Sequence, residues 1–470
     1  MNNGASIIKK KQANNKAVGG KAKARSSKSK TKAKGKRCDK IIYFDNNGTT
    51  LICPGAKKAY NDWISCYNIS TDSKISKNAR QAYKEAIDNL LTHCGVSTAT
   101  HTAVFTSGAT ESNCFIIRAC VKAFRQKLTE KGSDFEFVLP HIVVSAIEHK
   151  SIISCVEDLR AVGEIELSYV QPSIYGGISP EDVANAIQPN TCLISIMFAN
   201  NEIPIVNNIR VIGEIAHKFK VPLHSDCVQI FGKSRINIAE FNIDALSASA
   251  HKFYGPKGVG ILIINNDLID GYKLTAEING TQQGGLRGGT ENVPGVISCM
   301  AAIKHTFKRR KQKNKKLRLL RDTLLEKLAS LYPLVPYEAY LDFDKKERAD
   351  VEFVSLGPPN KMKPYILPNT VLLSICKNKG KPFCNIDLKH HLDNKNIIIS
   401  VGSACNTKSK SSSHVLDAIG APDVIKRGVI RISFNDQNTK KEINTFIDAL
   451  DIAIKEQTGD LKAATIASYD

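Results

Sequence analysis

The chain lacks any long uninterrupted apolar run, and none approaches the roughly 18 residues that a membrane-spanning helix requires. Its first residues, MNNGASIIKKKQ, contain no hydrophobic segment of signal-peptide length. Thirteen cysteines are present, yet no two form a C-x-x-C pair, so neither a zinc knuckle nor a disulfide framework is predicted. These absences exclude a transmembrane protein and favour a reducing compartment, which we expect to be the cytoplasm.

Acidic residues are nearly absent from residues 1–40, where 12 Lys and 2 Arg face the single acid Asp39. This segment carries +13 of the total net charge of +21. With so few apolar residues it cannot offset its ordering entropy, so we expect a disordered basic tail. It is either a solubilising tail or an arm that contacts nucleic acid or carries a nuclear address. A mitochondrial leader fits less well, because lysine rather than arginine dominates.

The remaining residues are sufficient for a large globular body. The chain has 470 residues, of which 42% are hydrophobic and 24% charged. We predict a large domain at 41–305 and a smaller C-terminal domain at 306–470. The N-terminal segment of the large domain is expected to contact the small domain as well. Apolar strands at HIVVSAIEH, CLISIMFANNE, PLHSDCVQ and ALSASAH alternate with helical stretches. This alternation indicates an α/β fold with a mostly parallel sheet between helices.

Polar side chains follow four of these strands. They are His149, Asn201, Asp226 with Gln229, and Lys252. Each has an ordinary alternative as a half-buried histidine, a turn residue, a helix cap or a surface lysine. Because parallel strands end at one edge of a sheet, their joint placement predicts a single crevice that holds all of them.

The stretch SASAHKFYGPKGVG indicates the chemistry of that crevice. A desolvated lysine such as Lys252 can condense with an aldehyde, and Ser249 and His251 can bind a phosphate. This combination suggests pyridoxal phosphate. In FTSGATESN, a strand ends in a segment that includes Ala109 and Thr110, and Glu111 opens a helix. The free backbone N–H groups at this helix start can bind the phosphate, although a capped helix start alone would look the same.

Downstream, a glycine-rich loop that contains Thr290 leads into a predicted long helix that reaches Leu328. The Lys/Arg face of this helix, from Lys304 to Arg321, is either solvated or meets an acidic partner. Residues 341–366 are charged and proline-rich, which predicts a surface insertion.

Two further residues carry chemical interest in the C-terminal part. Cys405 lies in the lysine-rich sequence ACNTKSKSSS, a setting that favours a reactive thiolate. Arg431, in VIRISF, can bind a carboxylate through two nitrogens, or else form a surface ion pair.

With these motifs assembled, the sequence from Ile41 to about Ile454 resembles the NifS-like cysteine desulfurases. These belong to the class V aminotransferases among the fold-type I pyridoxal phosphate enzymes. The resemblance rests on FTSGATESN, EHK, NNEI, HSDCVQ, SASAHKFYGPKGVG, RGGTENV, LPNT, SVGSAC and SHVL. It implies a large domain with a seven-stranded type of sheet and a smaller α+β domain. Gln283-Gly284, Ser412 and the region 68–78 depart from the family pattern, so the resemblance leaves dimer contacts, loop rigidity and acceptor choice open.

The resemblance also implies roles for single residues. Lys252 would bond the cofactor, Asp226 would pair with its ring nitrogen, and His149 would stack on the ring and move protons. Gln229 and Asn201 would contact the ring edge. The phosphate ligands would be Ala109, Thr110, Ser249 and His251, with Thr290 donated by the second subunit of a homodimer.

The implied reaction is the conversion of L-cysteine to L-alanine, in which Cys405 takes the sulfur as a persulfide and Arg431 holds the carboxylate. The sulfur would pass to an iron–sulfur scaffold or a thiolation carrier. Two alternatives remain at this stage. One is a selenocysteine lyase or another class V aminotransferase, and the other is a non-catalytic binding protein with a nucleic-acid-binding tail.

Overall fold

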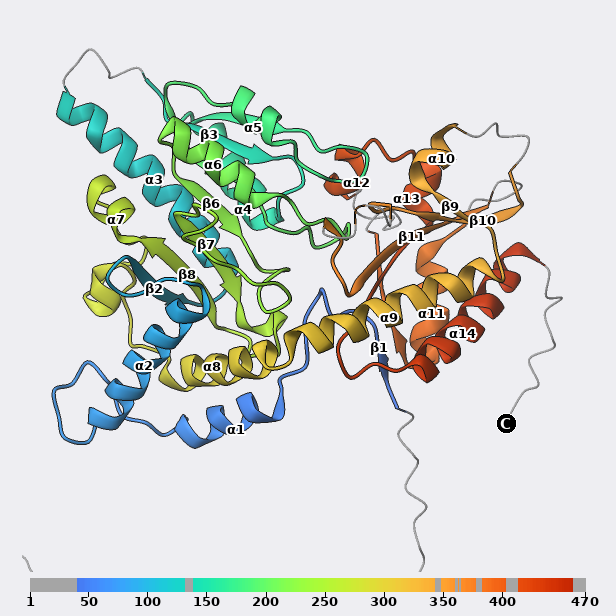
Figure 1. Ribbon diagram of the computed structural model, residues 1–470, viewed down its shortest axis with the longest axis horizontal. Helices are drawn as coiled ribbons and strands as arrows, with labels where there is room; N and C mark the ends of the chain where they lie inside the picture. The colour runs from blue at the N-terminus through green and yellow to red at the C-terminus, as the bar shows by residue number, and fades with distance from the viewer. Residues whose placement is uncertain are drawn as a thin grey trace, which may run out of the picture. The chain divides into compact units, whose positions relative to one another are not determined.

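A seven-stranded sheet forms the centre of the first part of the chain (Figure 1). The computed structural model describes residues 40–131, 138–342, 348–359, 362, 365–377, 383–402 and 413–459. Within them the strand order is β2-β8-β7-β6-β5-β3-β4, and β8 runs antiparallel to both of its neighbours. The mostly parallel sheet is therefore confirmed. The strands are β2 (His101–Thr106), β3 (His141–Ser145), β4 (Glu166–Val170), β5 (Thr191–Ser195), β6 (Leu223–Asp226), β7 (Ala245–Ser249) and β8 (Gly260–Asn265).

Helices cover both faces of this sheet, which explains why its strands are apolar on both sides. Successive residues of β8 illustrate the division: Ile261 and Ile263 pack into one hydrophobic cluster, and Leu262 into another. The cluster of Leu262 includes residues of α3 (Ala109–Lys131) and α4 (Lys150–Ala161). The other includes residues of α1 (Pro54–Trp63), α2 (Lys77–His93), α6 (Ile209–Phe219) and α8 (Val293–Phe307). The shorter helices α5 (Pro180–Asn185) and α7 (Asn266–Tyr272) complete this part.

A second, five-stranded sheet has the order β13-β14-β11-β10-β9 and is mostly antiparallel. Its strands are β9 (Leu334–Pro336), β10 (Val351–Ser355), β11 (Thr370–Lys377), β13 (Ser400–Val401) and β14 (Val429–Ser433). A third hydrophobic cluster packs this sheet against α9 (Arg310–Ala329), α11 (Asn385–Asn394) and α14 (Lys440–Thr458). The helices α10 (Tyr337–Asp342), α12 (His414–Ala418) and α13 (Asp423–Gly428) connect the strands. The smaller α+β part is thus also confirmed.

The start of the folded chain belongs to the second sheet's core rather than to the first. Strand β1 (Ile42–Tyr43) pairs with β12 (Ile397–Ile398), and Phe44 is buried in the third cluster. The described residues from Ile41 onward form a single compact unit, so the domain boundary near residue 305 stays a prediction. The predicted tail lies outside the described residues, apart from Lys40.

Two sequence-based predictions of local structure were wrong. The long helix is two helices, because Arg309 adopts a left-handed φ of 58° and interrupts the helix between α8 and α9. The stretch 341–366 is not only a surface insertion, since it contains β10, whose Phe353 and Val354 are fully buried. The short apolar core of this strand was obscured by the charged residues on both sides. No helix within the described ranges is long and apolar enough to cross a membrane.

Candidate active site

A cavity of about 600 Å³ opens at the ends of the large sheet's strands. Its volume is in the range usual for sites that bind small molecules. Ten of the twelve predicted site residues line it, together with residues that the sequence did not single out. The ten are Ala109, Thr110, His149, Asn201, Asp226, Gln229, Ser249, His251, Lys252 and Arg431.

Lys252 lies in the short 3-10 helix η2 (Ala250–Lys252), directly after β7. Its Nζ donates hydrogen bonds to the backbone carbonyls of Asn47 at 2.6 Å and Gly48 at 2.7 Å. Burial lowers the pKa of Lys252 to about 8, and the nearby guanidinium of Arg431 adds to the shift. A larger fraction of this amine is therefore neutral near pH 7 than for an exposed lysine, and a neutral amine is what attacks an aldehyde.

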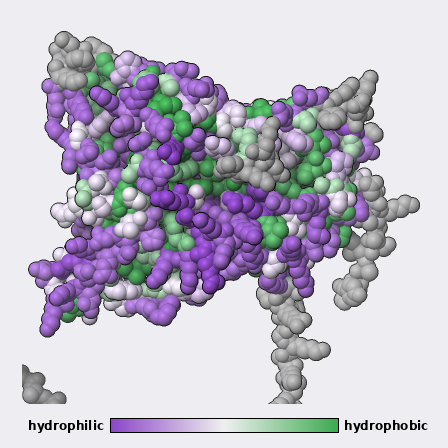
Figure 2. Space-filling view, in the orientation of Figure 1, coloured by the Kyte–Doolittle hydropathy of each residue, from purple (hydrophilic) through white to green (hydrophobic). Residues whose placement is uncertain are grey.

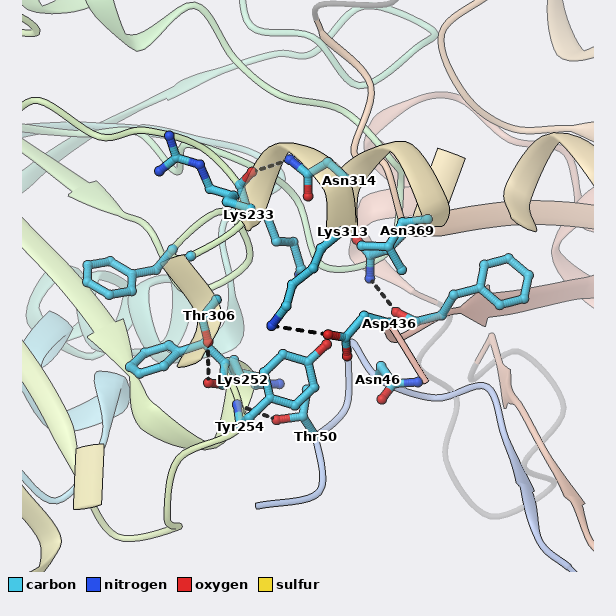
Figure 3. A pocket seen from close by; sticks show the side chains of 16 residues that line it. Asn46, Thr50, Lys233, Lys252, Tyr254, Thr306, Lys313, Asn314, Asn369 and Asp436 are labelled. Carbon is cyan, nitrogen blue, oxygen red and sulfur yellow. Dashed lines mark hydrogen bonds and ion pairs between the residues drawn. The ribbon is translucent and has the colours of Figure 1, made fainter. Parts of the chain in front are cut away.

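A second, smaller cavity of about 30 Å³ also has Lys252 in its wall (Figure 3). Lys313 pairs with Asp436 there at 3.1 Å, and Asn314 donates to the backbone carbonyl of Lys233 at 2.6 Å. Burial lowers the pKa of Lys233 to about 7. Residues from α9 and from the loop after β14 thus help to enclose Lys252. This enclosure contributes to the burial that lowers the pKa of Lys252.

Asp226 ends β6 and is almost completely buried. Its Oδ2 accepts a hydrogen bond from Asn113 Nδ2 at 2.9 Å, and its Oδ1 accepts one from the Val228 backbone at 2.9 Å. These two donors fix the carboxylate while leaving it in the cavity wall. It can therefore pair with a protonated nitrogen of a bound ring.

His149 caps the N-terminus of α4 and is exposed to the cavity. Its Nδ1 accepts a hydrogen bond from the Ser151 backbone N–H at 3.1 Å, so the neutral ring carries its proton on Nε2. Desolvation lowers the pKa of His149 below its usual value. The ring is consequently neutral near pH 7 and able to donate from Nε2.

Groups that can bind an anion line the same cavity as the lysine. The first turn of α3 contributes Ala109 and Thr110, whose backbone N–H groups precede the first full helical turn. Ser249 and His251 line the same cavity. Burial lowers the pKa of His251 to about 4, and the charges of Lys252 and Lys257 act in the same direction. His251 can therefore contribute a neutral donor to a phosphate.

Arg431 reaches the cavity from β14 of the second sheet. Its Nη1 donates to the backbone carbonyl of Asn201 at 2.8 Å, and its Nη2 pairs with Asp45 Oδ1 at 2.7 Å. Its Nε is buried and has no partner among the described residues. These two contacts hold the guanidinium in place and leave its other N–H groups, including that of Nε, for a ligand.

The residues present fit a bound pyridoxal phosphate. Buried oxygens of Asn201 and Gln229 have no hydrogen-bond partner in the part of the chain that the structure describes. Buried polar groups normally have partners, so these oxygens indicate a polar ligand in the cavity. An amine with a lowered pKa, a fixed carboxylate and a helix N-terminus match the aldehyde, ring nitrogen and phosphate of this cofactor.

The sequence did not single out the loop after β1 as part of the site. Asn47, Gly48 and Thr49 line the cavity, and Thr49 Oγ1 bonds His251 Nδ1 at 3.0 Å. The only available signal was a polar turn directly after a short apolar strand. Asn113 was missed as well, because its residue type alone does not indicate that it holds Asp226.

Two predicted residues are not among the described residues that line the cavity. Thr290 is exposed on the glycine-rich loop and does not line the cavity of its own chain. Its role across a subunit interface stays a prediction. Cys405 lies outside the described residues, in the gap 403–412 between β13 and α12.

The sheet order and the lysine-centred cavity define an α/β enzyme of the fold-type I, pyridoxal phosphate-dependent class. Residues 42–354 match the class-V aminotransferase family. The chain is 33% identical to the cysteine desulfurase IscS of Methanosarcina thermophila over 421 residues, which cover 88% of this chain and 91% of the relative.

Solved structures give the same result. A NifS-like protein matches with a TM-score of 0.73 and 27% identity, covering 90% of this chain and all of that one. SspA in complex with cysteine matches with a TM-score of 0.66 and 29% identity, covering 85% of this chain and 100% of the other. The chain therefore belongs to the class-V aminotransferase family, among its NifS/IscS-like cysteine desulfurases.

Proposed function

We propose that this protein is a pyridoxal phosphate-dependent cysteine desulfurase that converts L-cysteine to L-alanine and passes the sulfur to an acceptor. The observation that carries the proposal is the single cavity lined by Lys252, Asp226, the N-terminus of α3 and Arg431. The chain's relatives include proteins named cysteine desulfurase, and a similar structure contains cysteine. A transaminase would need the same four groups but would have no use for Cys405.

Lys252 and Asp226 would hold the two ends of the cofactor ring, and Gln229 and Asn201 would contact its edge. Thr110, Ser249 and His251 would bind its phosphate together with the first-turn amides of α3, including that of Ala109. When bound, the cofactor withdraws electrons from the substrate's Cα and so makes its proton removable. His149 would cover the ring from the α4 side.

The substrate's carboxylate would bind Arg431, which Asp45 and the Asn201 carbonyl hold in place. Lys252 would remove the α-proton at Nζ, since its lowered pKa provides a neutral amine. His149 would donate or accept a proton at Nε2. The carbonyls of Asn47 and Gly48 would orient the lysine amine when it is free.

Cys405 would act as the sulfur acceptor within the enzyme. Its thiolate would form an S–S bond with the substrate sulfur while the substrate's C–S bond breaks, leaving a persulfide on the enzyme. Protonation of the remaining three-carbon skeleton gives L-alanine. The enzyme would be a homodimer in which the second subunit contributes Thr290 to the site. It would act in the cytoplasm and pass the sulfur to an iron–sulfur scaffold or a thiolation carrier.

The test uses purified full-length protein loaded with pyridoxal phosphate and supplied with L-cysteine. Equal amounts of alanine and acid-labile sulfur are expected in the presence of a thiol reductant. Lys252→Ala should abolish both products. Transfer of the amino group of L-cysteine to an added keto acid, with no sulfur released, would instead support a transaminase.

A further inference from the structure

The α9 helix carries a dense basic surface that the proposed reaction does not use. Between Lys304 and Arg321 the sequence contains ten Lys or Arg residues and no acid. Figure 2 shows a broad hydrophilic surface over α9. Of these cations, Lys308, Lys311, Lys315 and Arg318 are exposed and form no ion pair with any other described residue. We call these four residues the α9 basic face.

Helix geometry places three of the four residues on one side. Lys311, Lys315 and Arg318 are spaced four and three residues apart, so they follow one line along the helix. The opposite side packs Leu317, Leu320 and Leu324 into the core around the second sheet. Lys308 lies just before α9, where Arg309 turns the chain. The face is therefore held in place by a helix whose opposite side is buried.

This arrangement is unfavourable for the chain alone. Cations three and four residues apart repel one another along a helix. The first turn of α9 contains no acidic residue, and Lys311 lies at the end of the helix where the backbone dipole is positive. An anion seated on the α9 basic face would relieve both effects.

The chemistry of the face favours nucleic acid over an acidic protein. A protein interface usually has an apolar centre with aromatic anchors. Among the described residues of α9, one large apolar side chain is exposed, Leu319 at 51%. Nucleic-acid interfaces are polar and strongly positive, and phosphate contacts by Lys and Arg dominate their affinity.

We propose that the α9 basic face is a docking surface for the phosphate backbone of a nucleic acid duplex. From Lys311 to Arg318 it extends about 10 Å, which matches about three phosphates of one strand. Binding there is independent of base sequence, because contacts to phosphate carry no sequence information. The four residues do not line the active-site cavity, so docking leaves the desulfurase reaction unobstructed.

The test measures binding of a fluorescein-labelled 20-base-pair RNA duplex by full-length protein at several salt concentrations. The test variant carries Lys308→Gln, Lys311→Gln, Lys315→Gln and Arg318→Gln. The control removes the same charge from exposed, unpaired sites elsewhere in the described chain, at Lys74, Lys122, Lys218 and Lys395. Both variants retain residues 1–40, so the tail contributes equally to each.

The test variant should lose at least about 10-fold in affinity at 0.1 M salt. The slope of log K against log salt is negative, and its magnitude should decrease by about 3 in this variant. The control should change the slope by less than about 1. Acetylation of Lys308, Lys311 and Lys315 in the wild-type protein should be suppressed by the duplex. Equal losses in both variants, or unprotected lysines, would overturn the proposal.

An acidic polypeptide is the competing occupant. If polyglutamate protects the three lysines and the duplex does not, the surface binds acidic protein and the proposal is wrong. Alanine formation from L-cysteine serves as the folding control, with wild-type rates expected for both variants. A protein that binds the duplex as predicted but makes no alanine would refute the proposed function alone.

Discussion

Lys252 donates from Nζ to the backbone carbonyl of Asn47 at 2.6 Å, across 205 residues of sequence. The loop after β1 therefore reaches the lysine that follows β7. Arg431 arrives from the second sheet and Asp45 from the same N-terminal loop, and the two form an ion pair at 2.7 Å. Three distant segments of the chain thus set the charge around one amine.

The reaction of the cofactor-free protein with pyridoxal phosphate should depend on pH through Lys252. Because the pKa of this lysine is lowered to about 8, the rate should rise with pH and level off above about pH 8 to 9. An ordinary lysine would continue to gain neutral amine to beyond pH 10. The measurement is the rate of absorbance change on cofactor addition at a series of pH values.

Variants of the two flanking charges should shift that profile in opposite directions. Arg431 lowers the pKa of Lys252 and Asp45 raises it. Arg431→Gln should therefore move the midpoint to higher pH, and Asp45→Asn should move it to lower pH. Shifts in the same direction would contradict this electrostatic account.

Asp226→Asn should retain the fold but reduce alanine formation by on the order of 100-fold or more, because it removes a fixed charge from the cavity. The rate is normalised to bound cofactor measured by absorbance. Asp244→Asn provides a control, since this partly buried carboxylate accepts a hydrogen bond from the Leu223 backbone and does not line the cavity. Comparable losses in both variants would indicate a structural effect only.

Arg431→Lys should raise the KM for L-cysteine by about 10-fold or more while changing kcat less, because lysine cannot reproduce the two-nitrogen geometry of arginine. Steady-state alanine formation gives both constants. Cysteamine, which lacks the carboxylate, should bind the wild-type and variant enzymes with equal affinity in competition assays. A weaker affinity of the variant for cysteamine as well would argue against a role in carboxylate binding.

Glu148 should make the folded protein less stable as pH rises. Burial raises the pKa of this carboxyl to about 8, so the folded protein keeps a proton that the unfolded chain releases above about pH 4.5. Stability should therefore fall between about pH 5 and pH 8. Glu148→Gln should flatten this dependence in urea unfolding, and exposed Glu85→Gln should not. A Glu148→Gln profile identical to wild type would contradict the assigned pKa.

The sequence was sufficient for the fold class and for most of the cavity, because the strand-end residues share one edge of a parallel sheet. The alternation of apolar strands and helices, with polar residues after the strands, placed His149, Asp226 and Lys252 in one crevice without any distance information. The contacts of Asn47 and Asn113 were not accessible in this way, since they join segments that neither spacing nor composition relates. The break at Arg309 was also hidden, because a single left-handed residue leaves helical periodicity almost intact.

The most direct test of the desulfurase proposal replaces the proposed sulfur acceptor. Full-length Cys405→Ala should bind pyridoxal phosphate and L-cysteine with wild-type spectra, yet form no alanine or enzyme-bound persulfide. Cys384→Ala, which changes another cysteine that is only partly buried, should remain active. Undiminished alanine and sulfide production by Cys405→Ala would contradict the proposal that this thiol takes the sulfur.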